Sequence, residues 1–118
     1  MTPMIVCYDK CSTCRKARKW LDAHEIDYAV RAIDKDNPTA EELRAWVTMS
    51  GLDVQKFFNT SGKLYREMNL KDKLKTMSDD EKIELLSVDG MLVKRPVLVL
   101  EDKVLVGFKE DAYAKELI

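Results

Sequence analysis

The spacing of apolar residues over the first third of the chain predicts a strand, a helix and a second strand. Residues 4–8 (MIVCY) form a short apolar run that is typical of a buried strand. From Cys11 to about Ala23 the apolar residues recur on one helical stripe, while Lys and Arg cover the remaining surface. Residues 26–33 fit a second strand. Because a helix joins the two strands within about 30 residues, this is a βαβ unit, and we expect the strands to be parallel.

The middle of the chain, residues 39–88, carries only helical patterns. Residues 39–42 (TAEE) have the Thr-x-x-Glu spacing of a capping box, and the helix that begins there is expected to end at Gly51. A shorter helical piece is predicted over residues 54–58, followed by a turn. Residues 78–81 (SDDE) form a second capping box ahead of another apolar stripe.

The strand pattern returns near the end of the chain. It predicts a hairpin with strands at residues 96–100 and 104–106, followed by a helix over residues 110–117. Without the helical block, the order β-α-β…β-β-α is that of the thioredoxin and glutaredoxin core. We therefore predict an α/β fold with a thioredoxin-like core and an inserted all-helical subdomain.

The length of the chain suits a single domain. All 118 residues are assigned to it, with the core at about 1–36 and 91–118 and the helical insertion at about 37–90. With 46% hydrophobic and 35% charged residues, the composition is that of an ordinary globular protein. No apolar run approaches the roughly 20 residues that span a bilayer, so no membrane association is expected. The first residues show no secretory signal, so we expect a cytoplasmic protein, and we expect it to be monomeric.

The charge is small overall but unevenly placed. A net charge of −1 predicts no direct binding to nucleic acid. Residues 1–20 carry five Lys or Arg against one Asp, a net charge of +4, which leaves −5 for the rest. Most of these basic side chains are interpreted as a solvated helix face.

All three cysteines lie within residues 7–14, where a metal site, a structural disulfide and a reactive thiol pair are the alternatives. A structural disulfide is disfavoured because the cytoplasm keeps thiols reduced. Zinc needs four ligands, and only Cys7 and His24 could join Cys11 and Cys14, so we expect no metal. Cys7 is interpreted as a core residue of its strand, and His24 as an exposed or capping residue near the helix end.

The pair Cys11-x-x-Cys14 favours thiol redox chemistry. Cys11 lies at the start of the helix, where free N–H groups and the helix dipole stabilise a thiolate. Cys14 follows one turn later and could resolve a mixed disulfide on Cys11. Ser12 and Thr13 could donate hydrogen bonds around a sulfur or an oxyanion. Three basic neighbours should add positive potential: Lys10, Arg15 and Lys16.

Arg95-Pro96 is the second candidate site. Pro96 begins a strand that should border Cys11, a position that favours a cis peptide bond. Such a proline would expose the backbone of Arg95, and the Arg95 guanidinium could bind an oxyanion or a carboxylate. An ordinary edge-strand proline beside a surface arginine is the alternative.

These features together resemble the ArsC family of arsenate reductase-related proteins, and within it the Spx/MgsR branch. The similarity covers nearly the whole chain and rests on four segments: residues 11–17 (CSTCRKA), 59–62 (NTSG), 65–66 (YR) and 95–96 (RP). The resemblance implies a thioredoxin-like fold with an inserted helical subdomain, a reactive thiol at Cys11, and Arg95 beside it.

The family includes more than one kind of function. Its arsenate reductases use a single motif cysteine among three arginines, with glutathione and glutaredoxin as reductants. Here only Arg95 matches, and Asn59 and residues 106–109 (VGFK) stand where the other arginines are expected. In Spx-like members the Cys-x-x-Cys pair is a redox switch, and the protein binds the C-terminal domain of the RNA polymerase α subunit. Gly51 could correspond to the glycine of that contact surface, and Cys14 is similar to the second switch cysteine.

The leading expectation is a thiol–disulfide oxidoreductase with Cys11 as nucleophile and Cys14 as resolving thiol. It needs no bound cofactor and would receive electrons from thioredoxin, glutaredoxin or a small thiol. The alternative is an Spx-like redox-sensing regulator that binds RNA polymerase, and arsenate reduction is third.

Overall fold

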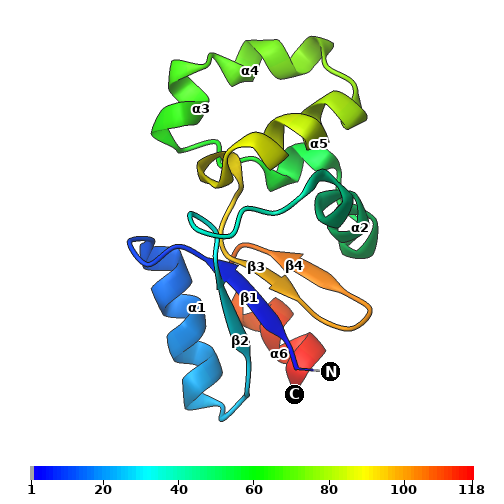
Figure 1. Ribbon diagram of the computed structural model, residues 1–118. Helices are drawn as coiled ribbons and strands as arrows, with labels where there is room; N and C mark the ends of the chain where they lie inside the picture. Colours follow the sequence, from blue (N-terminus) through cyan, green and yellow to red (C-terminus); the bar gives the residue numbers. More distant parts are fainter. Residues whose placement is uncertain (1) are drawn as a thin grey trace.

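The computed structural model describes residues 2–118 and contains, within that range, one four-stranded sheet in the order β2-β1-β3-β4 (Figure 1). β1 (Met4–Cys7) pairs in parallel with β2 (Ala29–Ala32) and antiparallel with β3 (Val97–Val99). β3 pairs antiparallel with β4 (Val104–Val106). The predicted order, β-α-β followed by helices and then β-β-α, is confirmed.

Side chains alternate between the two faces of the sheet, so the strands contribute to two hydrophobic clusters. In β1, Ile5 and Cys7 face one cluster, whereas Val6 faces the other. In β3, Leu98 belongs to the first cluster, and Val97 to the second. Because the two central strands are covered on both faces, they appear in the sequence as continuous apolar runs.

Two helices cover the first face of the sheet. They are α1 (Ser12–Ala23) and α6 (Glu110–Leu117), and Figure 1 shows both on the side away from the helical block. Ala17 and Leu21 of α1 are buried in the same cluster as Tyr113 of α6. Within residues 2–118, no helix combines the length and apolarity needed to cross a membrane.

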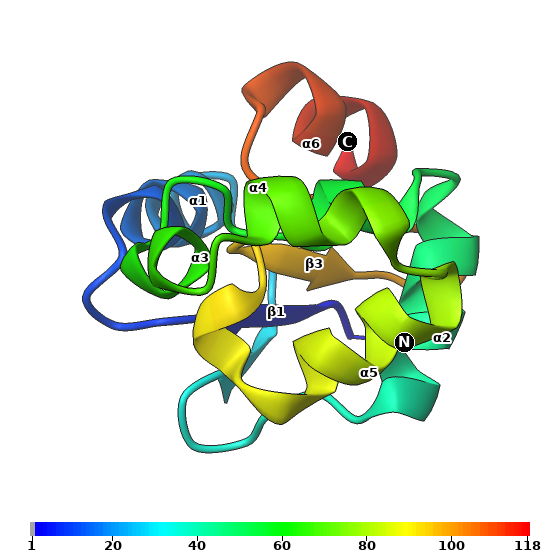
Figure 2. The ribbon, with the colours of Figure 1, turned by 90° about the horizontal axis from the view of Figure 1, so that it is seen from above.

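The helical block covers the second face (Figures 1 and 2). Its α-helices are α2 (Ala40–Ser50), α3 (Lys63–Glu67), α4 (Leu70–Lys73) and α5 (Asp79–Val88). Its 3₁₀ turns are η1 (Val54–Phe57), η2 (Leu74–Thr76) and η3 (Gly90–Leu92). Its buried side chains form one continuous cluster with those of the sheet face. The boundaries of the subdomain therefore stay a prediction.

Both predicted capping boxes are present. Thr39 Oγ1 accepts the Glu42 N–H at 3.1 Å, and Glu42 Oε1 accepts the Thr39 N–H at 3.1 Å. Ser78 and Glu81 make the same exchange at the start of α5, at 3.2 and 2.9 Å. Each such cap is worth about 1 kcal/mol to the helix that it begins. Gly51 ends α2 with φ at +70°, as its glycine predicts.

The second strand is shorter than the predicted range of residues 26–33, because residues 26–28 contact α1 and do not pair with β1. Glu25 takes a left-handed conformation with φ at +56°, and the Ile26 N–H donates to the Leu21 carbonyl at 3.0 Å. The Tyr28 hydroxyl donates to Asp22 Oδ1 of α1 at 2.9 Å. Pairing with β1 therefore begins only at Ala29.

An ion pair of Arg31 links β2 to the helical block. Its Nη1 and Nη2 atoms donate to the two carboxylate oxygens of Glu42 on α2, at 2.6 and 2.9 Å. The same guanidinium lies over the ring of Trp46, with 5.7 Å from Cζ to the centroid. The Arg31 interaction holds the pKa of Glu42 at about 2, against the opposing effect of burial. This bidentate pair links the first βαβ unit to α2.

Candidate functional site

The loop between β1 and α1 places Cys11 at the N-cap position of α1. The Cys11 N–H closes a turn onto the Tyr8 carbonyl at 3.0 Å, and the Cys11 carbonyl accepts the first helical bond from Arg15 at 3.2 Å. Cys11 itself is extended, with φ at −92° and ψ at 119°. The first N–H groups of the helix therefore point toward its side chain without acceptors from the helix itself.

The surroundings of Cys11 favour its thiolate. Partial burial opposes ionisation, but the Cys14 N–H, the Cys14 thiol and Arg95 together hold the pKa of Cys11 below 9.0. The thiol is partly exposed and lies on the wall of a cavity. An accessible thiol with a lowered pKa is the form that attacks disulfides and other electrophiles.

The surroundings of Cys14, one helical turn after Cys11, disfavour its thiolate. Its side chain is 1% exposed, and its sulfur accepts the Tyr8 N–H at 3.4 Å. Hydrogen bonding with Cys7, followed by burial, raises the pKa of Cys14. The predicted pair therefore consists of one accessible thiol that ionises readily and one buried thiol that keeps its proton.

Backbone pairing with the helical block positions Arg95. Phe58 and Val93 form an antiparallel bridge, and the Lys94 N–H donates to the Phe57 carbonyl at 2.8 Å. The peptide bond between Arg95 and Pro96 is cis, as predicted.

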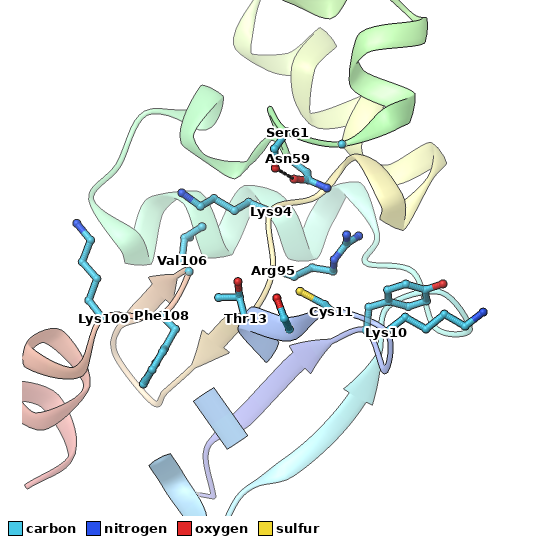
Figure 3. A pocket seen from close by; sticks show the side chains of 14 residues that line it. Lys10, Cys11, Thr13, Asn59, Ser61, Lys94, Arg95, Val106, Phe108 and Lys109 are labelled. Carbon is cyan, nitrogen blue, oxygen red and sulfur yellow. Dashed lines mark hydrogen bonds between the residues drawn. The ribbon is translucent and has the colours of Figure 1, made fainter. Parts of the chain in front are cut away.

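The Arg95 side chain lies beside Cys11 (Figure 3). Its Cζ lies 5.3 Å from the centroid of the Tyr8 ring, and Nη1 donates to Met91 Sδ at 3.7 Å. Within the described residues, its buried Nε has no hydrogen-bond partner. The contact with Tyr8 therefore holds, beside the cysteine, a guanidinium whose Nε has no partner among the described residues.

These groups surround a cavity of about 590 Å³. The cavity is lined from four parts of the chain: Tyr8, Lys10, Cys11, Ser12 and Thr13; Asn59, Ser61 and Gly62; Lys94 and Arg95; Val106, Gly107, Phe108 and Lys109. Among residues 2–118, the lining contains three Lys and one Arg but no Asp or Glu. The cavity therefore suits an anionic ligand.

The wall opposite Cys11 depends on Gly107. Its φ is +80°, a conformation that suits glycine, and its N–H donates to the Pro96 carbonyl at 2.8 Å. The buried Tyr113 hydroxyl donates to the Gly107 carbonyl at 3.1 Å. The ring of Phe108 packs edge-on against that of Tyr113, with 4.9 Å between centroids. These contacts hold the chain between β4 and α6 against the cavity.

The predicted site residues divide into two sets. Cys11, Ser12, Thr13 and Arg95 all line the cavity. Cys14 and Pro96 are buried behind it, where Pro96 shapes the backbone and does not touch the cavity space. His24 is the exposed residue that caps α1, and its Nδ1 lies 2.8 Å from the Trp20 carbonyl.

Two features of the site were missed or misjudged from the sequence. Tyr8 was interpreted only as a strand residue, yet its ring supports Arg95. Its position three residues before Cys11, at the end of a strand, is the signal that could have identified it. Lys10 lines the same cavity as Cys11, but the sequence does not predict that its side chain extends away from that sulfur (Figure 3).

The arrangement of potential metal ligands can be described for residues 2–118. Within residues 2–118, no group of three or more His, Cys, Asp or Glu side chains has the arrangement of a metal site. The three cysteines are free thiols.

Comparison with known proteins identifies the family. The model of the ArsC family matches residues 7–116. The uncharacterized protein YusI of Bacillus subtilis is 56% identical over 106 residues, which cover 90% of each chain. The regulatory protein MgsR of Bacillus subtilis is 31% identical over 101 residues, which cover 86% of this chain and 79% of MgsR. The crystal structure of an ArsC family-related protein from Bacteroides fragilis has a TM-score of 0.95 at 53% identity, covering 98% of this chain and 97% of that one. The sequence motif, the fold and these similarities agree, and the chain belongs to the ArsC family.

Proposed function

We propose that this protein is a thiol–disulfide oxidoreductase in which Cys11 attacks the substrate disulfide and Cys14 resolves the product. The observation that carries the proposal is the contrast between the two thiols. Cys11 is partly exposed on the cavity and has a lowered pKa, whereas Cys14 is 1% exposed one helical turn away. A nucleophile must meet its substrate, and a resolving thiol needs only to reach the nucleophile.

The reaction follows from these positions. The Cys11 thiolate attacks one sulfur of the substrate, and the other sulfur leaves as a thiolate that takes a proton from water. Cys14 then loses its proton and attacks the Cys11 sulfur, which releases the second substrate thiol and leaves a Cys11–Cys14 disulfide. The protein supplies two electrons in this cycle. Thioredoxin, glutaredoxin or a small thiol would return them.

Arg95 and the polar loop have supporting roles in this scheme. The Arg95 guanidinium, which lines the cavity, would orient an anionic group of the substrate and stabilise the Cys11 thiolate. Ser12 and Thr13 line the same cavity and would hydrogen-bond the bound group. Pro96, which is buried next to Arg95, would shape the backbone of the groove.

The test is thiol-dependent reduction of a model disulfide, such as the oxidised form of a small thiol. Cys11→Ser is expected to abolish turnover, and Cys14→Ser is expected to stop at a mixed disulfide on Cys11 that mass spectrometry detects. Lys19→Ser, an exposed change on the same helix, should keep full activity and serves as the matched control. Equal turnover in the wild type and Cys11→Ser would refute the assignment.

A redox-sensing regulator is the second candidate. The 31% identity to the regulatory protein MgsR favours it, together with the open surface at Gly51. Gly51 is exposed at the end of α2, and a Cβ placed there would meet no atom within 4 Å. Such a regulator would bind the C-terminal domain of the RNA polymerase α subunit. Binding to that domain that depends on the redox state of Cys11 and Cys14, with negligible turnover, would favour the regulator over the enzyme.

Arsenate reduction is the third candidate. The cavity offers a thiolate and cations, but Arg95 is the one arginine among its described lining residues. Asn59 and Lys109 occupy the region where the family's other arginines are expected. Each missing charge-assisted contact would weaken oxyanion binding by about 1.5–3 kcal/mol. Arsenate-dependent loss of free thiols is the measurement that tests it.

A further inference from the structure

The third cysteine of the motif region lies against the resolving thiol. Cys7 is the last residue of β1, and its side chain is 2% exposed on the face that α1 covers. It belongs to the same buried cluster as Cys14, Ala17 and Leu21. Cys7 was interpreted as an inert core residue, but its neighbour across the strand–helix interface is another sulfur.

One distance and the electrostatic surroundings associate the Cys14 sulfur with both of the other thiols. It accepts the Tyr8 N–H at 3.4 Å, and this nitrogen is bonded directly to the carbonyl carbon of Cys7. The Cys14 S–H also stabilises a thiolate at either of its neighbours, because it lowers the pKa of Cys7 and contributes to lowering the pKa of Cys11. Cys14 therefore shares the buried cluster with Cys7 and lies one helical turn from Cys11, whose thiol lines the cavity.

We propose that Cys7 is a second exchange partner of Cys14, which converts the Cys11–Cys14 disulfide into a buried Cys7–Cys14 disulfide and returns Cys11 as a free thiolate. In this step the Cys7 thiolate attacks the Cys14 sulfur, the Cys11–Cys14 bond breaks, and Cys11 leaves with the electron pair. The proton of Cys7 passes to water. No oxidant is consumed, because one disulfide is exchanged for another. The inference rests on the proposed function for its first step, the formation of the Cys11–Cys14 disulfide.

The surroundings of the three sulfurs favour this direction. The Cys11 thiolate keeps the N–H groups of Cys14 and Thr13 and the Arg95 guanidinium, so it is a good leaving group. Cys7 loses the S–H that lowers its pKa as soon as Cys14 enters a disulfide, so it ionises less, but the thiolate that forms is a stronger nucleophile than Cys11. A neutral disulfide suits an apolar cluster better than a buried thiolate does.

The attacking thiolate also has a cation nearby. Burial raises the pKa of Cys7 and is opposed in part by Arg18 of α1, which is half-buried, while Asp9 adds a smaller effect in the direction of burial. A fraction of Cys7 can therefore ionise to begin the exchange. The consequence is that oxidised protein would still present a reactive Cys11 to the cavity and could form a further mixed disulfide there.

The experiment oxidises the full chain with diamide, which does not depend on the unknown substrate. Free thiols are then labelled with N-ethylmaleimide before unfolding, and with a heavier maleimide after unfolding. Trypsin cuts after Lys10 and Arg15, so a Cys11–Cys14 disulfide stays within one peptide of residues 11–15. A Cys7–Cys14 disulfide instead joins that peptide to residues 1–10.

The expected result is a linked pair of peptides with the first label on Cys11. A disulfide confined to residues 11–15, with Cys7 labelled only after unfolding, would overturn the inference. Cys7→Ala is expected to lose the linked peptides and the Cys11 label together, and Ile5→Val, a similar reduction in the same cluster, should keep both. If Cys7→Ala fails to fold, the wild-type peptide map still decides.

The outcomes separate this inference from the proposed function. A Cys11–Cys14 disulfide alone, with model-disulfide turnover intact, refutes only the exchange with Cys7. Failure to form any disulfide, together with no turnover, refutes both.

Discussion

Replacing Glu42 with Gln is expected to destabilise the protein at neutral pH but not in acid. The Glu42 carboxylate accepts two bonds from Arg31, at 2.6 and 2.9 Å, and also accepts the Thr39 N–H at 3.1 Å. Gln keeps an oxygen for the capping box and nearly the same volume. The substitution therefore removes the charge of the pair that joins β2 to α2, and little else.

The size of the effect follows from the pKa. The lowering of the Glu42 pKa from 4.5 to about 2 is equivalent to about 3 kcal/mol of folding free energy. The Glu42 side chain is 36% exposed, against 12% for Arg31, so solvent screening reduces the expected loss to about 1–2 kcal/mol. Because the folded-state pKa is depressed, this stability is fully present above pH 4.5 and disappears as the pH falls toward 2.

Urea unfolding of Glu42→Gln and the wild type, at pH 7 and near pH 2, measures the difference. Glu81→Gln is the matched control, because Glu81 closes the other capping box from a fully exposed position, where Ser78 lowers its pKa. The loss at pH 7 should be larger for Glu42→Gln and should shrink in high salt. An equal loss for both variants, or a loss for Glu42→Gln that persists in acid, would show that the Arg31 pair is not the cause.

Three further substitutions test other parts of the structure. Arg95→Gln should raise the pKa of Cys11, because the thiolate loses a partner, and should slow alkylation of Cys11 by iodoacetamide near pH 6 roughly threefold. The control Arg44→Gln, at a half-exposed position, should leave the alkylation rate unchanged. Equal alkylation rates in both variants would contradict the role of Arg95. Tyr113→Phe removes the buried donor to the Gly107 carbonyl and should cost about 1–2 kcal/mol in urea unfolding. Tyr28→Phe, whose hydroxyl is exposed, should cost less, and the reverse order would argue against a structural role for that bond. Phe57→Ala empties a fully buried position and should cost about 3–5 kcal/mol, whereas Leu52→Ala, 42% exposed, should change the thermal midpoint little.

The parts of the fold that were predictable from the sequence have local causes. The capping boxes at Thr39 and Ser78 are formed by residues three positions apart, so the signal and the interaction lie in the same short segment. The end of α2 at Gly51 also has a local cause, because a helix that ends in the left-handed conformation favours glycine and the sequence shows where that glycine lies. The cis bond at Pro96 was predicted from its place at the start of a strand that borders Cys11.

The parts that were not predictable depend on contacts between distant segments. β2 begins at Ala29, later than predicted, and the Tyr28 hydroxyl before it is bonded to Asp22 on the preceding helix. The apolar pattern of residues 26–33 gives no sign of this bond. The stacking of Arg95 on Tyr8 joins residues from opposite ends of the chain. The direction of Lys10 depends on the path of an irregular loop, which sequence spacing does not determine. The role proposed for Cys7 arises from a strand–helix packing that brings it to Cys14.

The place of Cys11 at the helix cap links redox chemistry to folding. The N–H groups that stabilise its thiolate are in turn stabilised by that negative charge, so the reduced protein gains folding free energy that the Cys11–Cys14 disulfide form lacks. A disulfide across two intervening residues closes a short loop, so it constrains the unfolded chain less than a disulfide between distant residues would. The interaction of the thiolate with the helix that begins at Ser12 would therefore favour the dithiol and would make a Cys11–Cys14 disulfide more oxidising than it would be without the helix. In the proposed reaction, the stability that the thiolate gives to this helix and the readiness of the disulfide to accept electrons would share one free energy.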